Sequence, residues 1–112
     1  MGEAKLNFEF FSQDFCFIGH SHQPFIVENN EGQIACPGGP EVEVKDSSRY
    51  LINVGSVGQP RDTDPRACYA ICDLEEKTVK IKRIEYDVEA AQNSLIKQGL
   101  PKELAERLAY GW

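Results

Sequence analysis

Short apolar runs that stop at Gly, Pro, Asn or Asp constrain this chain most, because runs of that length form strands rather than long helices. Two of them, residues 15–19 and 50–54, have the unbroken apolar character of strands buried on both faces. Further strands are predicted at 24–27, 33–36, 41–44, 67–74 and 78–86. The last two form a predicted hairpin, and the alternation within it slips at Arg83 and Ile84, which indicates a bulge or a strand that crosses an edge.

A helix is predicted near the N-terminus. Ala4, Phe8, Phe11 and Phe15 follow a spacing of 4, 3 and 4, which indicates an amphipathic helix over about residues 3–13. Apolar residues also alternate within this stretch, so a strand is the weaker alternative.

Two helices are predicted at the C-terminal end. Asp87 suits an N-cap, Gly99 suits the C′ position after the first helix, and Pro101 suits the first turn of the second. The order of helix, several strands and two helices lacks regular β-α alternation, which argues against a Rossmann-type parallel sheet. We therefore expect one α+β domain over residues 1–112, with a mostly antiparallel or mixed sheet and helices packed against it.

Composition excludes several classes of protein. The net charge of −6 argues against an extended nucleic-acid-binding face, although bound metal ions could still make a local phosphate site. No apolar run is long enough to span a bilayer and the first residues do not resemble a signal peptide, so a cytoplasmic protein is expected. No C-x-x-C pair occurs, and Cys16, Cys68 and Cys72 lie in apolar runs, as reduced buried thiols do.

The only two histidines stand together in Gly19-His20-Ser21-His22, directly after a predicted strand. If the chain stays extended there, His20 and His22 point to the same side and can reach one metal ion or two neighbouring ones. Gly19 leaves room for close approach of backbone or ligand. The same pattern also fits a pair of exposed or hydrogen-bonded histidines.

A second unusual stretch, residues 53–62, also follows a strand. It offers glycines, backbone N–H groups and Arg61, which could line a phosphate site. The alternative is a surface loop held by ion pairs from Arg61 to Asp62 and from Arg66 to Asp64.

Together the two stretches resemble a known family. Gly19-His20-Ser21-His22-Gln23-Pro24 and Asn53-Val54-Gly55-Ser56-Val57-Gly58-Gln59-Pro60-Arg61-Asp62 are similar to the C-terminal motifs of calcineurin-like metallophosphoesterases. The nearest group is the predicted phosphoesterases related to diadenosine tetraphosphatases. The resemblance continues through 64–67, 86–91 and 99–101, so it covers nearly the whole chain. It implies the C-terminal half of a four-layer α/β/β/α sandwich.

The resemblance also implies a site. Carried over by position, His20 and His22 would each bind one metal of a dinuclear centre made of Mn, Fe, Zn, Co or Ni. The residues expected to lie near the substrate are Gly19, Asn53, Gly55, Ser56 and Arg61. The implied activity is hydrolysis of phosphomonoester or phosphodiester bonds, with a phosphorylated small molecule or nucleotide as substrate.

The family's N-terminal motifs, D-x-H, G-D and G-N-H-D/E, do not occur in this sequence. Two imidazoles cannot fill two coordination spheres, and no catalytic residue is identified, so the chain alone is predicted to have little or no activity. The alternative function is a non-catalytic oligomeric remnant that serves as a binding or regulatory module. Uncovered sheet edges and faces predict a homo-oligomer, or pairing with a missing N-terminal half.

Overall fold

The structure is a computed structural model that describes residues 2–112. The elements along the chain are α1 (Gly2–Asn7), β1 (Phe15–Ile18), β2 (Phe25–Asn30), β3 (Gln33–Ala35), β4 (Glu41–Glu43), β5 (Ser48–Asn53), β6 (Ala67–Asp73), β7 (Thr78–Ile84), α2 (Val88–Lys97), α3 (Lys102–Glu106) and the 3-10 turn η1 (Arg107–Ala109). The strands form two sheets, one in the order β1-β5-β2-β3 and the other in the order β4-β7-β6.

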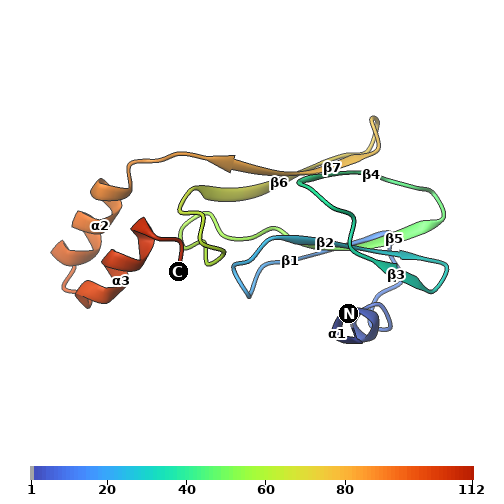
Figure 1. The fold of residues 1–112 in the computed structure, drawn as a ribbon, viewed down its shortest axis with the longest axis horizontal. Coiled ribbons are helices and arrows are strands. Elements are labelled where there is room, and N and C mark those ends of the chain that lie inside the picture. Colours follow the sequence, from blue (N-terminus) through green and yellow to red (C-terminus); the bar gives the residue numbers. More distant parts are fainter. Residues whose placement is uncertain (1) are drawn as a thin grey trace.

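The two sheets face each other across an apolar core (Figure 1). Ile26, Tyr50 and Ile52 from the first sheet meet Val79 from the second, and all four side chains are buried. β5 is an inner strand of its sheet, parallel to β1 and antiparallel to β2. The prediction of a buried strand at 50–54 is therefore confirmed.

The outer face of the first sheet is partly covered by α1 and the segment after it. Phe8 is buried there against Val27 and Leu51. The guanidinium of Arg49 donates to the carbonyls of Phe8 and Phe11 at 3.2 and 2.6 Å and lies over both rings. Cation–π contact and charge-assisted hydrogen bonds together fix this segment to β5.

Two predictions on this part of the chain are wrong in extent. α1 ends at Asn7 instead of continuing to about residue 13. The next N–H groups, of Glu9 and Phe10, bond carbonyls only three residues back, so the chain tightens into turns there. β1 is a strand, but it lies at the edge of its sheet. Phe17 and Ile18 are consequently 47% and 37% exposed rather than buried on both faces.

The hairpin of β6 and β7 contains no bulge, since its register is unbroken along both strands. Arg83 stays in phase with Val79 and so belongs to the inner face. Its guanidinium forms an ion pair with Asp62. The apparent slip at Arg83 and Ile84 is therefore a paired charge at an inward position, which the fold tolerates because it is paired.

The two C-terminal helices begin and end largely as predicted. The Asp87 carboxylate accepts a hydrogen bond from the Ala90 N–H at 3.0 Å, and Gly99 follows the C-cap Gln98 with φ +78°. Pro101 is the N-cap of α3 rather than part of its first turn. Figure 1 shows α2 and α3 beyond the ends of the sheets, so the expectation that they pack on a sheet face is wrong.

The C-terminal turn ties these helices to the loop that joins β5 and β6. Thr63 N–H donates to the Gly111 carbonyl at 2.9 Å. Gly111 has φ +69°, and a Cβ on it would lie 2.7 Å from the backbone nitrogen of Asp64, so only glycine allows this contact. Among residues 2–112, no helix is long and apolar enough to cross a membrane.

Candidate functional site

The two sequence motifs lie side by side. β1 and β5 are parallel neighbours, so the histidine loop after β1 and the loop after β5 leave the same end of the sheet. Val54 N–H donates to the Ile18 carbonyl at 2.8 Å, which keeps the two chains together beyond the last paired residues. The fold therefore brings together the residues that the sequence singled out.

The chain turns sharply between the histidines instead of staying extended. His22 N–H donates to the Gly19 carbonyl at 2.9 Å, and His22 has φ +59°. The condition for the same-side arrangement, an extended chain, is therefore not met, and strand alternation does not set the directions of the two imidazoles. His20 is exposed, whereas His22 is half-buried.

His22 is held by the second loop on both its ring and its backbone. Its Nδ1 lies 2.8 Å from the carbonyl oxygen of Gln59. Its own carbonyl accepts from Arg61 N–H at 3.2 Å, and the Gln23 side chain donates to the Arg61 carbonyl at 3.0 Å. One short loop thus fixes the position of this imidazole.

The buried side chain of Asn53 connects the two loops by hydrogen bonds. It is 1% exposed, its amide nitrogen donates to the Ser21 hydroxyl at 2.8 Å, and its amide oxygen accepts from Gly55 N–H at 2.9 Å. Gly55 has φ +74°, and a Cβ on it would lie 2.7 Å from the Cys68 sulfur. Asn53 and Gly55 therefore fix the backbone conformation at the start of the loop after β5.

Ser56 and Arg61 make contacts within the same loop. The Ser56 hydroxyl accepts from Gln59 N–H at 2.9 Å, and the Arg61 guanidinium donates to the Gln59 side chain at 2.8 Å. The predicted ion pair from Arg61 to Asp62 is wrong, because Asp62 pairs with Arg83.

The nearby carboxylates are engaged by arginines. The predicted pair of Asp64 with Arg66 is confirmed, at 2.8 Å. Hydrogen bonds from Arg66, with the added charge of Arg83, lower the pKa of Asp64 to about 2. The Asp64 carboxylate is therefore ionised and paired with Arg66 at any ordinary pH.

The cysteines have structural surroundings as well. Cys68 is buried, Cys16 and Cys72 are half-buried, and all three are free thiols. Burial raises the pKa of the Cys68 and Cys72 thiols, which keeps them protonated and unreactive.

The described residues do not form a complete metal site. Among residues 2–112, no group of three or more His, Cys, Asp or Glu side chains is placed to hold a metal ion. An imidazole whose one ring nitrogen is held by a backbone carbonyl has the arrangement common among metal ligands. Two imidazoles alone do not complete a dinuclear centre. A dinuclear centre would need ligands beyond the two imidazoles.

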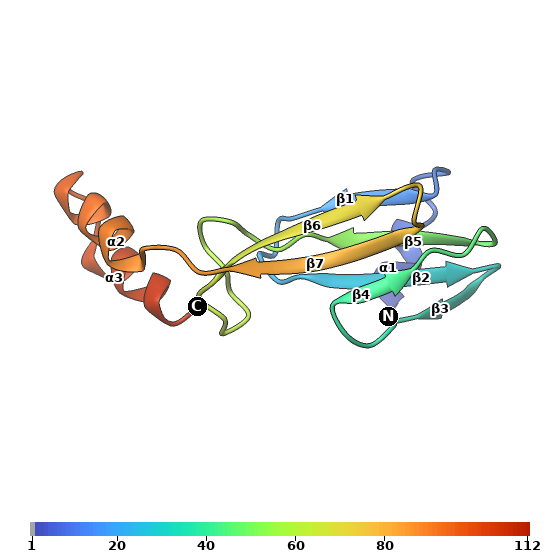
Figure 2. The same cartoon turned by 90° about the horizontal axis from the view of Figure 1, so that it is seen from above.

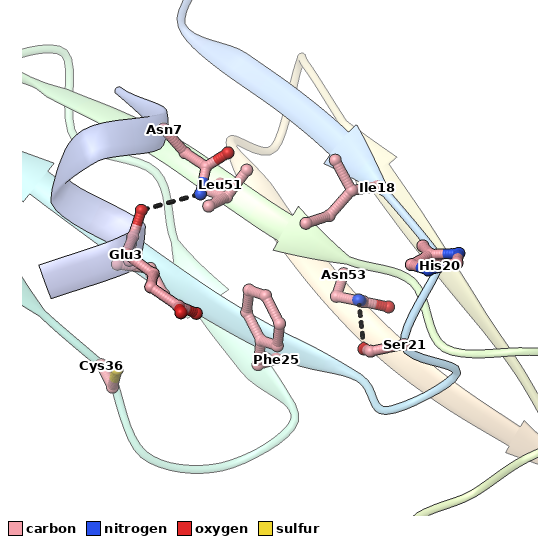
Figure 3. Close-up of a pocket in the computed structure, with 11 residues that line it drawn as sticks. Glu3, Asn7, Ile18, His20, Ser21, Phe25, Cys36, Leu51 and Asn53 are labelled. Carbon is pink, nitrogen blue, oxygen red and sulfur yellow. Dashed lines mark hydrogen bonds between the residues drawn. The ribbon is translucent and has the colours of Figure 1, made fainter. Parts of the chain in front are cut away.

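A cavity of about 420 Å³ opens on the outer face of the first sheet, beside the histidine loop (Figure 3). Its apolar lining comes from Ile18, Phe25, Val27 and Leu51, and His20, Ser21 and Asn53 border one end. Sequence reasoning missed this cavity, because only the pairing of β1, β5 and β2 brings these residues onto one face.

Two facing sheets, a helix on one outer face and a histidine loop at the strand ends are the features that the motifs implied for a metallophosphoesterase. The chain is similar to a metallophosphoesterase from Sphaerobacter thermophilus of known structure, with a TM-score of 0.86 and 40% identity over 97% of this chain and 47% of that one. It is also 43% identical over 98 residues to the uncharacterized protein MJ0912 of Methanocaldococcus jannaschii, covering 88% of this chain and 40% of that protein. No family model matches the sequence.

The chain spans less than half the length of both proteins. The predicted resemblance is confirmed: in sequence and fold this chain corresponds to a half of a metallophosphoesterase. The expected α+β half-sandwich is confirmed with it.

Proposed function

We propose that this chain is the histidine-bearing part of a metal-dependent phosphoesterase, with His20 and His22 as ligands of divalent metal ions. The observation that carries the proposal is that loop 53–61 holds His22 by hydrogen bonds to its ring and to its backbone. The chain that contains this contact is similar in structure to a metallophosphoesterase. Divalent metals at such a site activate water and neutralise charge on a phosphoryl group. The substrate class is a phosphomonoester or phosphodiester, met in the cytoplasm.

In this proposal, the remaining metal ligands come from residues other than the described ones. The two imidazoles occupy only part of the coordination that Mn, Fe, Zn, Co or Ni requires, so the chain alone does not turn over substrate. Gly19, Asn53, Gly55 and Ser56 serve to shape and hold the two loops, and exposed Arg61 is the residue best placed to meet a phosphate.

A second candidate function is a non-catalytic oligomeric module. It is favoured by the lack of a three-ligand group among residues 2–112 and by apolar side chains left exposed on two edge strands. β1 and β6 run along the same side of the sandwich (Figure 2). A second copy of the chain, or the remainder of a phosphoesterase, would cover that side.

Metal binding by the purified chain tests the first proposal. Co²⁺ should bind to the chain and not to a His20→Ala/His22→Ala variant, as measured by equilibrium dialysis with elemental analysis. Neither protein should hydrolyse p-nitrophenyl phosphate or bis-p-nitrophenyl phosphate above the rate with Co²⁺ alone. Equal binding by the two proteins would contradict the proposal, and histidine-dependent turnover by the chain alone would contradict its second part.

A further inference from the structure

We propose that Ser56 is a positioning residue for His22: it acts through the Gln59 peptide to hold the imidazole as the Nδ1–H tautomer, with the Nε2 lone pair open. The sequence resemblance placed Ser56 near the substrate instead. The assignment of the tautomer stands on geometry alone, and only its consequence for metal binding rests on the proposed function.

The tautomer follows from the nature of the partner. Nδ1 of His22 lies 2.8 Å from the Gln59 carbonyl oxygen, which can only accept a hydrogen bond. Nδ1 must therefore carry the proton, and in the neutral ring Nε2 is then the unprotonated nitrogen. Metal ligands are commonly oriented in this way, with the remote ring N–H donating to a backbone carbonyl.

The direction of the Gln59 carbonyl is itself fixed from two sides. Ser56 Oγ accepts a hydrogen bond from Gln59 N–H at 2.9 Å, which holds the start of that residue. The next residue, Pro60, is fully buried, and the residue before a proline is restricted to extended conformations. With the N–H and the following peptide both held, the carbonyl has little freedom to turn away from His22.

Ser56 is anchored to the sheet in turn. Its carbonyl accepts from Cys68 N–H at 2.9 Å, at the start of β6. Gly55 packs so closely on Cys68 that no side chain fits there. A continuous line of contacts therefore runs from β6 through Ser56 and Gln59 to the imidazole of His22.

The Ser56 hydroxyl oxygen is thus used inside the protein. The side chain is half-buried, and its oxygen faces the Gln59 N–H within its own loop. The Ser56 hydroxyl therefore has a hydrogen-bond partner within the protein, and no bound ligand is needed to explain a hydroxyl at this position. It also predicts that threonine, which keeps the hydroxyl, can replace serine, whereas alanine cannot.

Long-range ¹H–¹⁵N correlation spectra of the ¹⁵N-labelled chain test the tautomer directly. They are recorded with a chelator present and in alkaline buffer, where imidazole is neutral. His22 should give the Nδ1–H pattern, and exposed His20 serves as an internal reference in the same spectrum. Ser56→Ala should shift His22 toward a mixture of tautomers, while Ser56→Thr and the exposed turn variant Ser47→Ala should leave it unchanged.

Two results would overturn the proposal: a wild-type His22 in the Nε2–H form, or a folded Ser56→Ala variant whose His22 pattern equals that of the wild type. If Ser56→Ala does not fold, exchange of the Gln59 amide in the wild-type chain decides the matter. Slow exchange supports the hydrogen bond to Ser56, and exchange as fast as in an exposed loop contradicts it.

Co²⁺ affinity gives the second readout. Loss of the group that hydrogen-bonds a ligand typically weakens metal binding about 10- to 100-fold. Because Ser56 reaches His22 only through Gln59, we expect a loss at the lower end of that range in Ser56→Ala and none in Ser47→Ala. If the tautomer depends on Ser56 while the wild-type chain binds no Co²⁺, the positioning role stands and the proposed function fails. Equal affinity in a binding wild type and Ser56→Ala would contradict the role of Ser56 toward the metal.

Discussion

The buried amide of Asn53, at the end of β5, donates a hydrogen bond to the hydroxyl of Ser21, which stands between the two histidines. The two residues are 32 positions apart in sequence and 2.8 Å apart in space. This contact joins the two motifs below the surface, so the shape of the histidine loop depends on a side chain from the neighbouring strand.

Asn53→Ala should destabilise the fold by about 1–3 kcal/mol, because it leaves the buried Gly55 N–H without its acceptor. Urea unfolding followed by circular dichroism measures the change. Asn93→Ala, at an exposed position on α2, is the matched control and should lie close to the wild type. Equal stability of the two variants would show that the Asn53 contacts contribute nothing.

Gly55→Ala should be more damaging than Gly58→Ala in the same loop. At Gly55 the backbone has φ +74° and a Cβ would meet the Cys68 sulfur at 2.7 Å, whereas a Cβ at Gly58 has nothing within 4 Å. Overpacking of this kind costs about 1–3 kcal/mol, to which the unfavourable φ adds. Thermal unfolding of both variants, compared under one condition, checks the order. A Gly58→Ala variant as unstable as Gly55→Ala would contradict it.

Acid should weaken the fold through Asp64. Its pKa is lowered from 3.8 to about 2 by Arg66 and Arg83, so the folded state binds a proton less readily than the unfolded state. The stabilisation is complete above about pH 4 and is lost as the pH falls toward about 2. Buried Glu28 acts in the same direction: desolvation raises its pKa, but hydrogen bonds from Ser48 and Tyr50 and the charge of Lys45 together lower it by more.

The measurement is the free energy of unfolding in urea from about pH 5 to about pH 2, for the wild type and Asp64→Asn. The wild type should lose more stability over this range than the variant does. Parallel curves for the two proteins would mean that the arginines do not stabilise the Asp64 carboxylate.

The open side of the sandwich predicts self-association. Phe17 of β1 and Ile71 of β6 are 47% and 44% exposed, on edge strands that run along one side of the molecule (Figure 2). Light scattering at micromolar concentration should give a mass above that of one chain, and Phe17→Lys/Ile71→Lys should lower it. A one-chain mass for the wild type would contradict this expectation.

The elements that the sequence predicted well are those with local signals. Asp87 and Gly99 mark the limits of α2 through a side-chain cap and a positive φ, both of which depend only on neighbouring residues. The turn between β6 and β7 is likewise local, because the Asp73 carboxylate accepts from the N–H groups of Glu75 and Glu76.

What the sequence could not predict depends on contacts between distant segments. The inward place of Arg83 follows from its ion pair with Asp62, 21 positions away. The direction of the His22 ring follows from the carbonyl of Gln59 in another loop. The H-x-H spacing identified the residues, but only the fold defines how each imidazole is held.

A chimera tests the central claim most directly. In it, residues 1–112 replace the stretch of the Sphaerobacter thermophilus metallophosphoesterase on which this chain superposes. With Mn²⁺ or Co²⁺, the chimera should hydrolyse p-nitrophenyl phosphate or bis-p-nitrophenyl phosphate. His20→Ala or His22→Ala should abolish that activity, and Asn93→Ala should preserve it. A folded, metal-loaded chimera that is inactive, or one whose activity survives both histidine substitutions, would contradict the assignment of this chain as the histidine-bearing half of a phosphoesterase.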